Sequence, residues 1–167
     1  MAHTLIVGIT GSGKTTVAKN LAVTYRRRGV GVLVLTPCLH DSWESDFITD
    51  NPELFLQVVF ANRNCAIFVD ECGEMIGRWA GPMTKLATRS RHWGHNVHFI
   101  GQRATMIDPN VRSMCECFFI FKQSATDAKI VAIESACDVF LDAATLKKGQ
   151  CLAKIGIDGK CRLIKVF

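Results

Sequence analysis

The stretch GITGSGKT at residues 8–15 fits the pattern G-x-x-x-x-G-K-[ST] without a gap. The apolar run before it, HTLIV at residues 3–7, predicts a strand, and the sequence after it, residues 17–29, predicts a helix that ends at Gly29. In such a strand–loop–helix, glycines let backbone N–H groups turn toward phosphate oxygens, and the helix N-terminus adds positive potential. The stretch therefore predicts a site for a nucleoside triphosphate, which we expect to be ATP.

The positions of this loop have distinct expected contacts. Lys14 is expected to reach the β- and γ-phosphates, the Thr15 hydroxyl to ligate Mg²⁺, and Thr16 to contact the α-phosphate. The other residues expected to bind the cofactor are Gly8, Thr10, Gly11, Ser12 and Gly13. The alternative is a glycine-rich turn that binds nothing, and the surrounding strand and helix patterns argue against it.

Apolar runs alternate with helical patterns along the rest of the chain. Strands are expected at residues 30–35, 65–71, 96–101 and 117–122, helices at 51–64, 82–93 and within 126–149, and a polar irregular segment at 36–50. Two strand-like runs flank Asp158-Gly159, which predicts a two-residue hairpin turn and an antiparallel edge. The alternation predicts an α/β fold with a mostly parallel central sheet. Together with the P-loop at residues 8–15 it resembles the three-layer P-loop NTPases of the RecA-like (ASCE) type, which is the expected fold.

Composition sets broad limits on the class of protein. The 167 residues are 49% hydrophobic and 21% charged, which suits a single globular domain over residues 1–167. No run approaches the ~18 apolar residues of a membrane span, and no signal peptide is visible, so we expect a cytoplasmic protein. The net charge of +5 is only a mild bias toward polyanions. The eight cysteines include no CxxC pair, which favours reduced thiols over a zinc site.

Two acids end the apolar run CAIFVDE at residues 65–71. Asp70 is expected to hold the Mg²⁺ shell, and Glu71 to polarise a water molecule for attack on the γ-phosphate. A pair of solvated acids at a strand end is the alternative, which a P-loop upstream makes weaker. Because nucleotide kinases need no water activator, Glu71 favours hydrolysis over phosphoryl transfer to another nucleotide.

The run NVHFIG at residues 96–101 ends in an amide and a guanidinium, Gln102 and Arg103. In ATPases with an extra strand beside the P-loop strand, a polar residue at the end of that strand points at the γ-phosphate. Gln102 is expected to orient the attacking water and to sense the γ-phosphate, with capping of a loop as the alternative. Arg103 has three open roles: contact with phosphate, with DNA or with a neighbouring subunit.

The segments IFVDECGEMI (67–76), TRSRHWGHNVHFIGQR (88–103) and IDPNVRSMCECFFIF (107–121), in this order, resemble the FtsK–HerA superfamily of DNA-pumping ATPases. They are most similar to its small viral genome-packaging ATPases, and also to the zonula-occludens-toxin-like phage proteins. The resemblance extends over residues ~3–122. The matching positions are Asp70, Glu71, Arg91-His92-x-Gly94, Gln102 and Arg112.

The resemblance implies an ATP-driven ring, with six subunits the expected number, that translocates double-stranded DNA into a viral capsid. A capsid portal or vertex protein would be a partner, and host cytoplasm or the virion the location. In the family an arginine completes the site of the neighbouring subunit; the candidates are Arg89, Arg91, Arg103 and Arg112, of which Arg91 and Arg112 hold family-like positions. The absence of a membrane segment weighs against the membrane-anchored toxin-like proteins.

The DNA-contacting part is less defined. Residues 73–85 carry Arg78, Trp79 and Lys85 between glycine and proline hinges and are a candidate pore loop, with an ordinary solvated loop as an equal alternative. Two other functions stay open: a small nucleotide kinase, and a nucleotide-gated phage assembly protein with slow hydrolysis. Stimulation of ATP turnover by DNA, or by a nucleoside monophosphate, distinguishes them.

Overall fold

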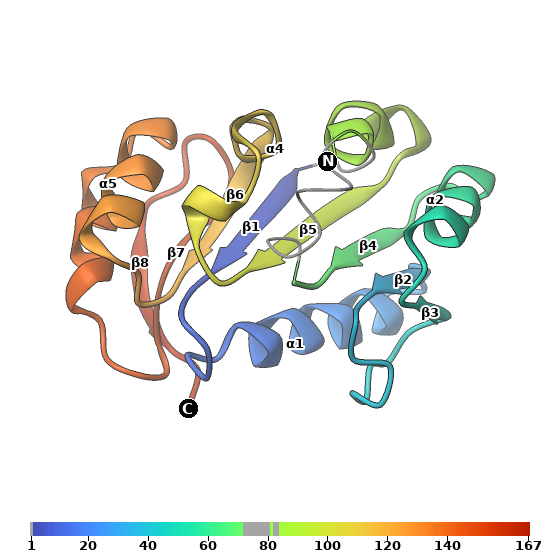
Figure 1. Cartoon of the computed structure of the whole chain (residues 1–167), viewed down its shortest axis with the longest axis horizontal. Helices are drawn as coiled ribbons and strands as arrows, with labels where there is room; N and C mark the ends of the chain where they lie inside the picture. Colours follow the sequence, from blue (N-terminus) through green and yellow to red (C-terminus); the bar gives the residue numbers. More distant parts are fainter. Residues whose placement is uncertain (1, 72–80, 82–83) are drawn as a thin grey trace.

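The computed structural model describes residues 2–71, 81 and 84–167, whose strands form one open sheet (Figure 1). The strands are β1 (His3–Val7), β2 (Val32–Leu35), β3 (Phe47–Thr49), β4 (Ala66–Val69), β5 (Asn96–Gly101), β6 (Cys115–Ile120), β7 (Gln150–Lys154) and β8 (Arg162–Lys165). The helices are α1 (Lys14–Arg27), α2 (Pro52–Ala61), α4 (Pro109–Ser113) and α5 (Ala125–Glu134), with 3-10 segments η1 (Ser90–Trp93), η2 (Ala104–Met106) and η3 (Asp138–Thr145). Residues 84–89 are also helical.

The sheet has the order β3-β2-β4-β5-β1-β6-β7-β8. The first six strands in this order, from β3 at the edge to β6, pair with one another in parallel. Strand β7 pairs antiparallel with both β6 and β8. Strand β5 lies between β4 and β1, so an extra strand separates the P-loop strand from the strand that ends in the two acids. The predicted α/β class, the mostly parallel sheet and the antiparallel C-terminal hairpin are therefore confirmed.

Helices cover both faces of the sheet, which gives three layers (Figure 1). Helix α1 lies on one face, and α2, α4 and α5 lie on the other. Successive side chains of a strand point to opposite faces, so Ile6 of β1 packs into the core under α1, while Leu5 and Val7 enter the core on the other side. Strands buried on both faces explain why their sequences read as continuous apolar runs. No helix of the described residues is long and apolar enough to cross a membrane.

Local signals in the sequence mark two of the helix ends. Helix α1 ends just before Gly29, whose φ of 73° is the left-handed conformation that glycine adopts without strain. Helix α2 begins at Pro52, and the side chain of Asn51 accepts hydrogen bonds from the backbone N–H groups of Glu53 and Leu54. Both predicted ends are confirmed.

Two details of the sequence prediction were wrong. The segment 36–50 contains β3, a strand too short to show a period, which pairs with β2 through the register of Val34 with Ile48. The hairpin of β7 and β8 forms, but its connection is residues 155–161 rather than Asp158-Gly159 alone. A turn from Gly156 to Gly159, closed by a backbone hydrogen bond of 3.2 Å, lies within this connection.

A buried histidine lies at the centre of the sheet. His98 of β5 stacks on Phe68 of β4 with ring centroids 4.4 Å apart and planes 12° apart. Neither ring nitrogen has a hydrogen-bond partner among the described residues. Burial, and to a smaller extent His3, lowers the pKa of His98 to about 3. The ring is therefore neutral in the folded protein at pH values where it would be charged in the unfolded chain.

We expect His98→Phe to make stability less sensitive to acid. A folded-state pKa below the unfolded value means that the stability is present above pH ~6.5 and is lost as the pH falls toward 3. One such histidine lowers the free energy of unfolding by about 1.4 kcal/mol for each pH unit below 6.5, which corresponds to a fall of roughly 3–6 °C in Tm. Between pH 7 and pH 5 the Tm of His98→Phe should fall less than the Tm of the wild type. The control is His92→Phe, a change at an exposed position, whose Tm should fall as much as that of the wild type. An equal loss in all three proteins would contradict this account.

Candidate nucleotide site

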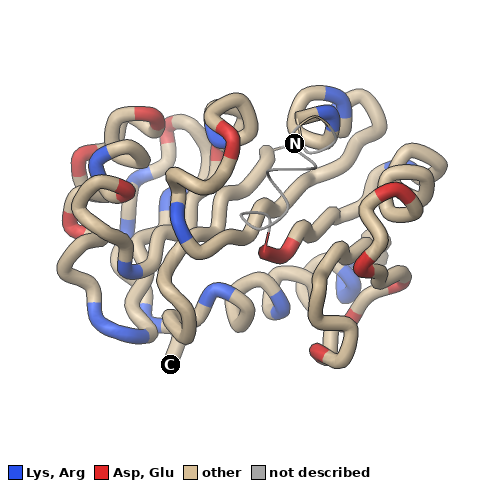
Figure 2. The backbone as a smooth tube through the Cα atoms, in the orientation of Figure 1, with Lys and Arg blue, Asp and Glu red and all other residues tan. Residues whose placement is uncertain are grey.

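The residues predicted to bind and hydrolyse nucleotide come together at one edge of the sheet. The carboxyl ends of the parallel strands β1, β4 and β5 meet there, and the P-loop, the acid pair and Gln102 follow them directly. Figure 2 shows the acidic end of β4 near the start of α1. This edge is where ligands of open α/β sheets bind, because the loops that leave the strands face a common crevice.

Two glycines give the P-loop its shape. Gly13 has a φ of 116°, a left-handed conformation that a side chain would strain. Gly8 passes so close to the end of β6 that a Cβ atom there would lie 2.4 Å from Cβ of Phe121. The N–H of Gly8 also donates to the carbonyl of Gly101 at 3.2 Å. The loop is thus fixed to the ends of both strands that flank β1.

Lys14 is the buried cation of the site. Its Nζ donates to the carbonyl of Ile9 at 3.1 Å, across the loop. Burial lowers the pKa of Lys14, while the negative charges of Glu71 and Asp70 act to raise it. The ammonium is therefore held in a poorly solvated position, where it interacts strongly with negative charge.

Asp70 is 6% exposed and has fixed oxygens. The hydroxyl of Thr36 donates to Oδ2 at 3.4 Å, and the backbone N–H of Glu71 donates to Oδ1 at 3.0 Å. Burial raises the pKa of Asp70, and the adjacent Glu71 raises it further. Sequence reasoning missed Thr36, although a hydroxyl that directly follows the buried strand β2 was a signal of the same kind as the acids after β4.

Glu71 and Gln102 are in contact. Gln102 Nε2 donates a hydrogen bond to Glu71 Oε2 at 3.3 Å. Glu71 has a φ of 51°, which is uncommon outside glycine and typical of functional positions held by their surroundings. The two residues lie 31 positions apart in sequence, and their contact depends on β5 being the neighbour of β4.

The buried side chain of Gln123, which is 4% exposed, holds the backbone of Gln102 in place. Gln123 Nε2 donates to the carbonyl of Gln102 at 3.1 Å, and its Oε1 accepts from the N–H of Ala104 at 3.3 Å. This residue was not singled out from the sequence. The signal was a second polar residue shortly after an apolar strand, in FFIFKQ at residues 118–123.

Arg103 contacts an acid of its own chain. Its Nε donates to Asp127 Oδ2 at 3.0 Å, and the Arg103 side chain remains 54% exposed. Asp127 is fully buried and also accepts hydrogen bonds from the N–H and hydroxyl of Thr105. Burial alone would raise the pKa of Asp127, but hydrogen bonds from Ser124, Thr105 and Arg103 outweigh it and lower the pKa. Asp127 therefore fastens the segment after Gln102 to the first turn of α5.

The guanidinium of Arg112 is hydrogen-bonded within its own chain. Its Nε and Nη2 each donate to a carboxylate oxygen of Glu134 at 2.7 Å, and Nη1 donates to the carbonyls of Ala104 and Ile107. The Arg112 side chain is only 7% exposed. These bonds account for the arginine within its own subunit, and its action in a neighbouring site stays a prediction.

Arg91 and Arg89 lie near the opposite end of the parallel strands, just before β5. Arg91 forms an ion pair with Glu116 at 2.7 Å and donates to the carbonyl of Met114 at 3.0 Å. Arg89 is exposed and forms no ion pair with any described residue. In the candidate pore loop, Arg78 and Trp79 lie outside the described residues.

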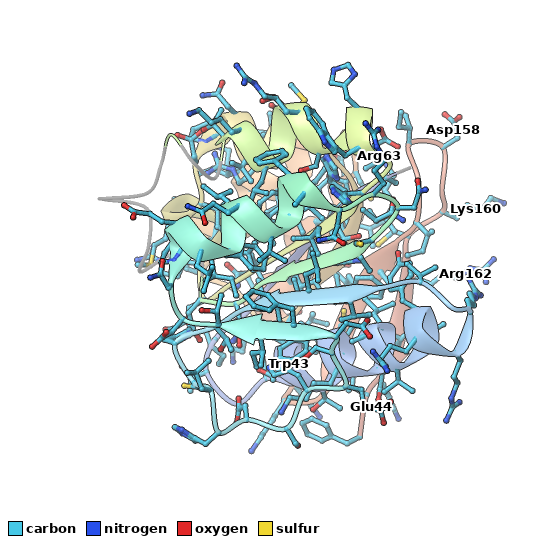
Figure 3. All side chains as sticks on the ribbon, turned by 90° about the vertical axis from the view of Figure 1, so that its right-hand side faces the viewer. Trp43, Glu44, Arg63, Asp158, Lys160 and Arg162 are labelled. Atoms are coloured by element: carbon cyan, nitrogen blue, oxygen red, sulfur yellow. The ribbon has the colours of Figure 1, made fainter. Side chains whose placement is uncertain are left out.

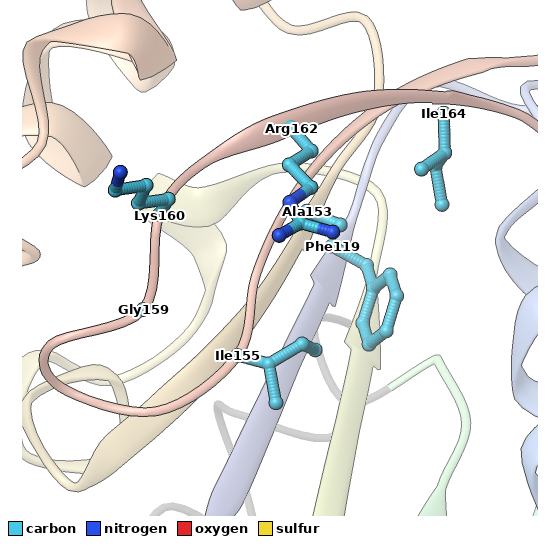
Figure 4. Close-up of a pocket in the computed structure, with 7 residues that line it drawn as sticks. All are labelled: Phe119, Ala153, Ile155, Gly159, Lys160, Arg162 and Ile164. Carbon is cyan, nitrogen blue, oxygen red and sulfur yellow. The ribbon is translucent and has the colours of Figure 1, made fainter.

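A hollow on the hairpin is separate from the nucleotide site. It has a volume of about 490 Å³ and is lined by Phe119, Ala153, Ile155, Gly159, Lys160, Arg162 and Ile164 (Figure 4). The hairpin connection lies at the amino end of the parallel strands, because β7 runs antiparallel to β6. Lys160 and Arg162 lie at the right-hand edge of the view in Figure 3. None of the described residues that line this hollow belongs to the P-loop, the acid pair or Gln102.

The family model of zonular occludens toxin (Zot) matches residues 24–128. No curated protein matches the chain. The sequence-based argument against toxin-like phage proteins, which relied on the lack of a membrane segment, is overturned by this match.

Solved structures match nearly the whole chain. The genome packaging NTPase B204 from Sulfolobus turreted icosahedral virus 2, in complex with AMPPCP, has a TM-score of 0.81 at 13% identity and covers 98% of this chain and 97% of its own. The pCW3 conjugation coupling protein TcpA has a TM-score of 0.76 at 16% identity, covering 98% and 59%. VirB4 of Thermoanaerobacter pseudethanolicus has a TM-score of 0.73 at 10% identity, covering 99% and 89%. The predicted resemblance to FtsK–HerA-type ATPases is confirmed in the fold.

We expect Asp70→Asn to raise the thermal stability of the nucleotide-free protein at pH 7. Because burial and Glu71 raise the pKa of Asp70 in the folded state, ionisation of this carboxyl opposes folding, and the amide avoids that cost. The gain should disappear well below the ordinary pKa of an aspartate, where Asp70 is protonated in both states. Calorimetry of both proteins at about pH 7 and about pH 2.5 measures it; a lower Tm for Asp70→Asn at pH 7 would contradict the raised pKa of Asp70.

We expect Arg112→Met to lower the free energy of unfolding by about 2–4 kcal/mol, since it leaves Glu134 and two carbonyls without their donor. Arg89→Met, at an exposed position, should change it by less than ~0.5 kcal/mol. Urea unfolding of both variants measures the difference. A stable Arg112→Met protein that loses only activity would instead support a role in a neighbouring site.

Proposed function

The chain belongs to the zonular occludens toxin (Zot) family, and from this membership and the geometry of the site we propose that it is an ATP-hydrolysing motor that moves double-stranded DNA. The motor is one P-loop domain over residues 1–167. Viral genome packaging is the use that fits best with the fold shared with a genome packaging NTPase. The contact of Gln102 with Glu71, beside the P-loop lysine, is the observation that carries the proposal.

This contact favours hydrolysis over a kinase reaction. A kinase transfers the γ-phosphoryl group to an acceptor that it must bind and shield from water, so a carboxylate that activates water is a disadvantage. Here Glu71 is held by an amide at the end of the inserted strand β5, at the edge where the P-loop binds phosphate. The arrangement supports an activated water molecule as the acceptor.

The reaction follows from the positions of three side chains. Glu71 accepts a proton from a water molecule as the water oxygen bonds to the γ-phosphorus. The bond from that phosphorus to the β,γ-bridging oxygen breaks, and its electron pair leaves with ADP. Lys14 stabilises the negative charge on the β- and γ-phosphate oxygens, and Gln102 keeps the Glu71 carboxylate oriented and contacts the γ-phosphate.

The residues present fit a magnesium ion. Mg²⁺ prefers oxygen ligands, and the Thr15 hydroxyl and the buried Asp70 carboxylate are both oxygen donors close to the P-loop in sequence or in the fold. Thr36 and the N–H of Glu71 hold Asp70 in one orientation. When bound, the ion supplies charge neutralisation between the β- and γ-phosphates.

Translocation requires that neighbouring subunits act in turn, and we place this chain in a ring, with six subunits expected. Arg112, Arg91 and Arg103 all have acidic partners within their own chain. Arg89 is exposed, and all four arginines stay candidates for the one that reaches a neighbouring site, with Arg91 and Arg112 at the family-like positions. A capsid portal or vertex protein would dock the ring, in the host cell or in the virion.

The match to the Zot family favours a second candidate function, a nucleotide-gated phage assembly protein. In that case hydrolysis is slow and changes the state of an assembly instead of moving DNA. Both functions use the same nucleotide site, so they differ in what controls turnover.

We expect duplex DNA to raise ATP turnover by the wild type several-fold. Glu71→Gln should lower turnover by about 10²- to 10⁴-fold with ATP binding retained, and Gln102→Ala should lower it by a smaller factor. Phosphate release with and without DNA, together with the ATP Kd, measures these effects. Lys165→Ala, a change at an exposed residue of β8, is the matched control.

The outcomes separate the candidates. Normal hydrolysis by both site variants would show that the site is wrongly assigned. Turnover that depends on Glu71 but is indifferent to DNA would favour the assembly protein. Stimulation by a nucleoside monophosphate would favour a kinase, and a monomer in the presence of a non-hydrolysable ATP analogue would exclude an arginine supplied by a neighbour.

A further inference from the structure

A second side of the P-loop carries features that the hydrolytic residues do not use. Two hollows, of about 280 and 320 Å³, lie against the loop and share Gly11 and Lys148. The smaller hollow is lined by Gly11, Gly13, Lys14, Thr15, Thr16, Lys148 and Phe167. Two of these residues, Lys148 and Phe167, come from the end of the chain, far from the P-loop in sequence.

Backbone hydrogen bonds fix this end of the chain to the P-loop. The N–H of Gly149 donates to the carbonyl of Ser12 at 3.2 Å, and the N–H of Val166 donates to the carbonyl of Gly149 at 2.8 Å. Figure 2 shows basic residues in the turn before β7, close to the C-terminus and to the P-loop. Lys148 and Phe167 are therefore brought to the loop by the sheet itself, through β7 and β8.

The ring of Phe167 packs against the loop by its edge. A Cβ atom at Gly13 would lie 3.1 Å from Phe167 Cε1, and one at Gly149 would lie 3.0 Å from Cδ2. Both positions are glycines, and side chains there would displace the ring. Phe167 nevertheless remains 66% exposed, so much of the ring surface is open to a planar ligand.

The direction of the bound nucleotide follows from the sheet order. The residues at the γ-phosphate, Glu71 and Gln102, follow β4 and β5, on one side of β1. The P-loop pattern predicts that Thr16 contacts the α-phosphate, so the nucleoside would continue away from β5, toward the side of β6, β7 and β8. Lys148 and Phe167 lie on that side and share a hollow with Thr16.

We propose that this hollow is the nucleoside subsite, in which the base stacks on the ring of Phe167 and the ammonium of Lys148 binds the α-phosphate. The subsite rests on the proposed nucleotide-binding function. Among the described residues that line it, none carries a carboxylate or amide side chain that could read the edge of a base. Recognition is therefore by stacking, which every purine offers, and the site accepts ATP and GTP alike.

Tripolyphosphate tests the stacking, because it has the three phosphates of ATP and no base. We expect Phe167→Ala to raise the Kd for ATP about 5- to 100-fold and to leave the Kd for tripolyphosphate unchanged. Phe167→Trp should keep ATP binding, since the larger ring also stacks. Lys148→Gln should weaken both ligands by similar factors, because both carry the α-phosphate. Lys165→Ala, outside the hollow, is the control.

Calorimetric titration of the full chain with ATP, GTP and tripolyphosphate measures these constants. In the wild type, ATP and GTP should differ in Kd by less than about threefold. A Phe167→Ala protein that binds ATP normally, or loses both ligands equally, would overturn the stacking. A difference of more than tenfold between ATP and GTP would overturn the lack of base selection. Failure of the wild type to bind any of the three would instead overturn the nucleotide-binding function itself, and Lys14→Ala provides the reference for that loss.

Discussion

The insertion of β5 between β1 and β4 is the constraint on which the rest of the site depends. Parallel pairing on both sides of β5 brings three strand ends to one edge in register, with Val7 paired to Gly101 and Val69 to Phe99. The P-loop follows β1, the acid pair follows β4, and Gln102 follows β5. These residues can therefore be far apart in sequence and still lie close together, because the pairing of the strands sets the distances between them.

Much of this arrangement was predictable because the signals are local. The P-loop pattern, the apolar strand that ends at Asp70, and the apolar strand that ends at Gln102 each lie within a short segment, and each is followed by polar residues for which a buried strand has no use. Since the carboxyl ends of parallel strands share an edge, the meeting of these segments also follows from the fold class. The caps at Gly29 and Asn51 were predictable for the same reason.

What the sequence could not provide were interactions between distant segments with no pattern of their own. The partner of an arginine depends on how distant segments pack. The ion pair of Arg112 with Glu134 could therefore not be predicted from the sequence around Arg112. Strand β3 is too short for periodicity, and its place depends on pairing with β2. Gln123 and Asp127 read as ordinary polar residues near the beginning of a helix. Only the structure shows that both are buried, with Gln123 bonded to Gln102 and Asp127 bonded to Arg103.

Helix α5 is tied at both ends to the segment that follows Gln102. Asp127, in its first turn, holds Arg103 and Thr105, and Glu134, in its last turn, holds Arg112. The bonds of Arg103 and Arg112 to these carboxylates are charge-assisted, so they hold the helix and this segment together as one unit. A displacement of Gln102 would thus act on α5 at both of its ends, through Asp127 and Glu134.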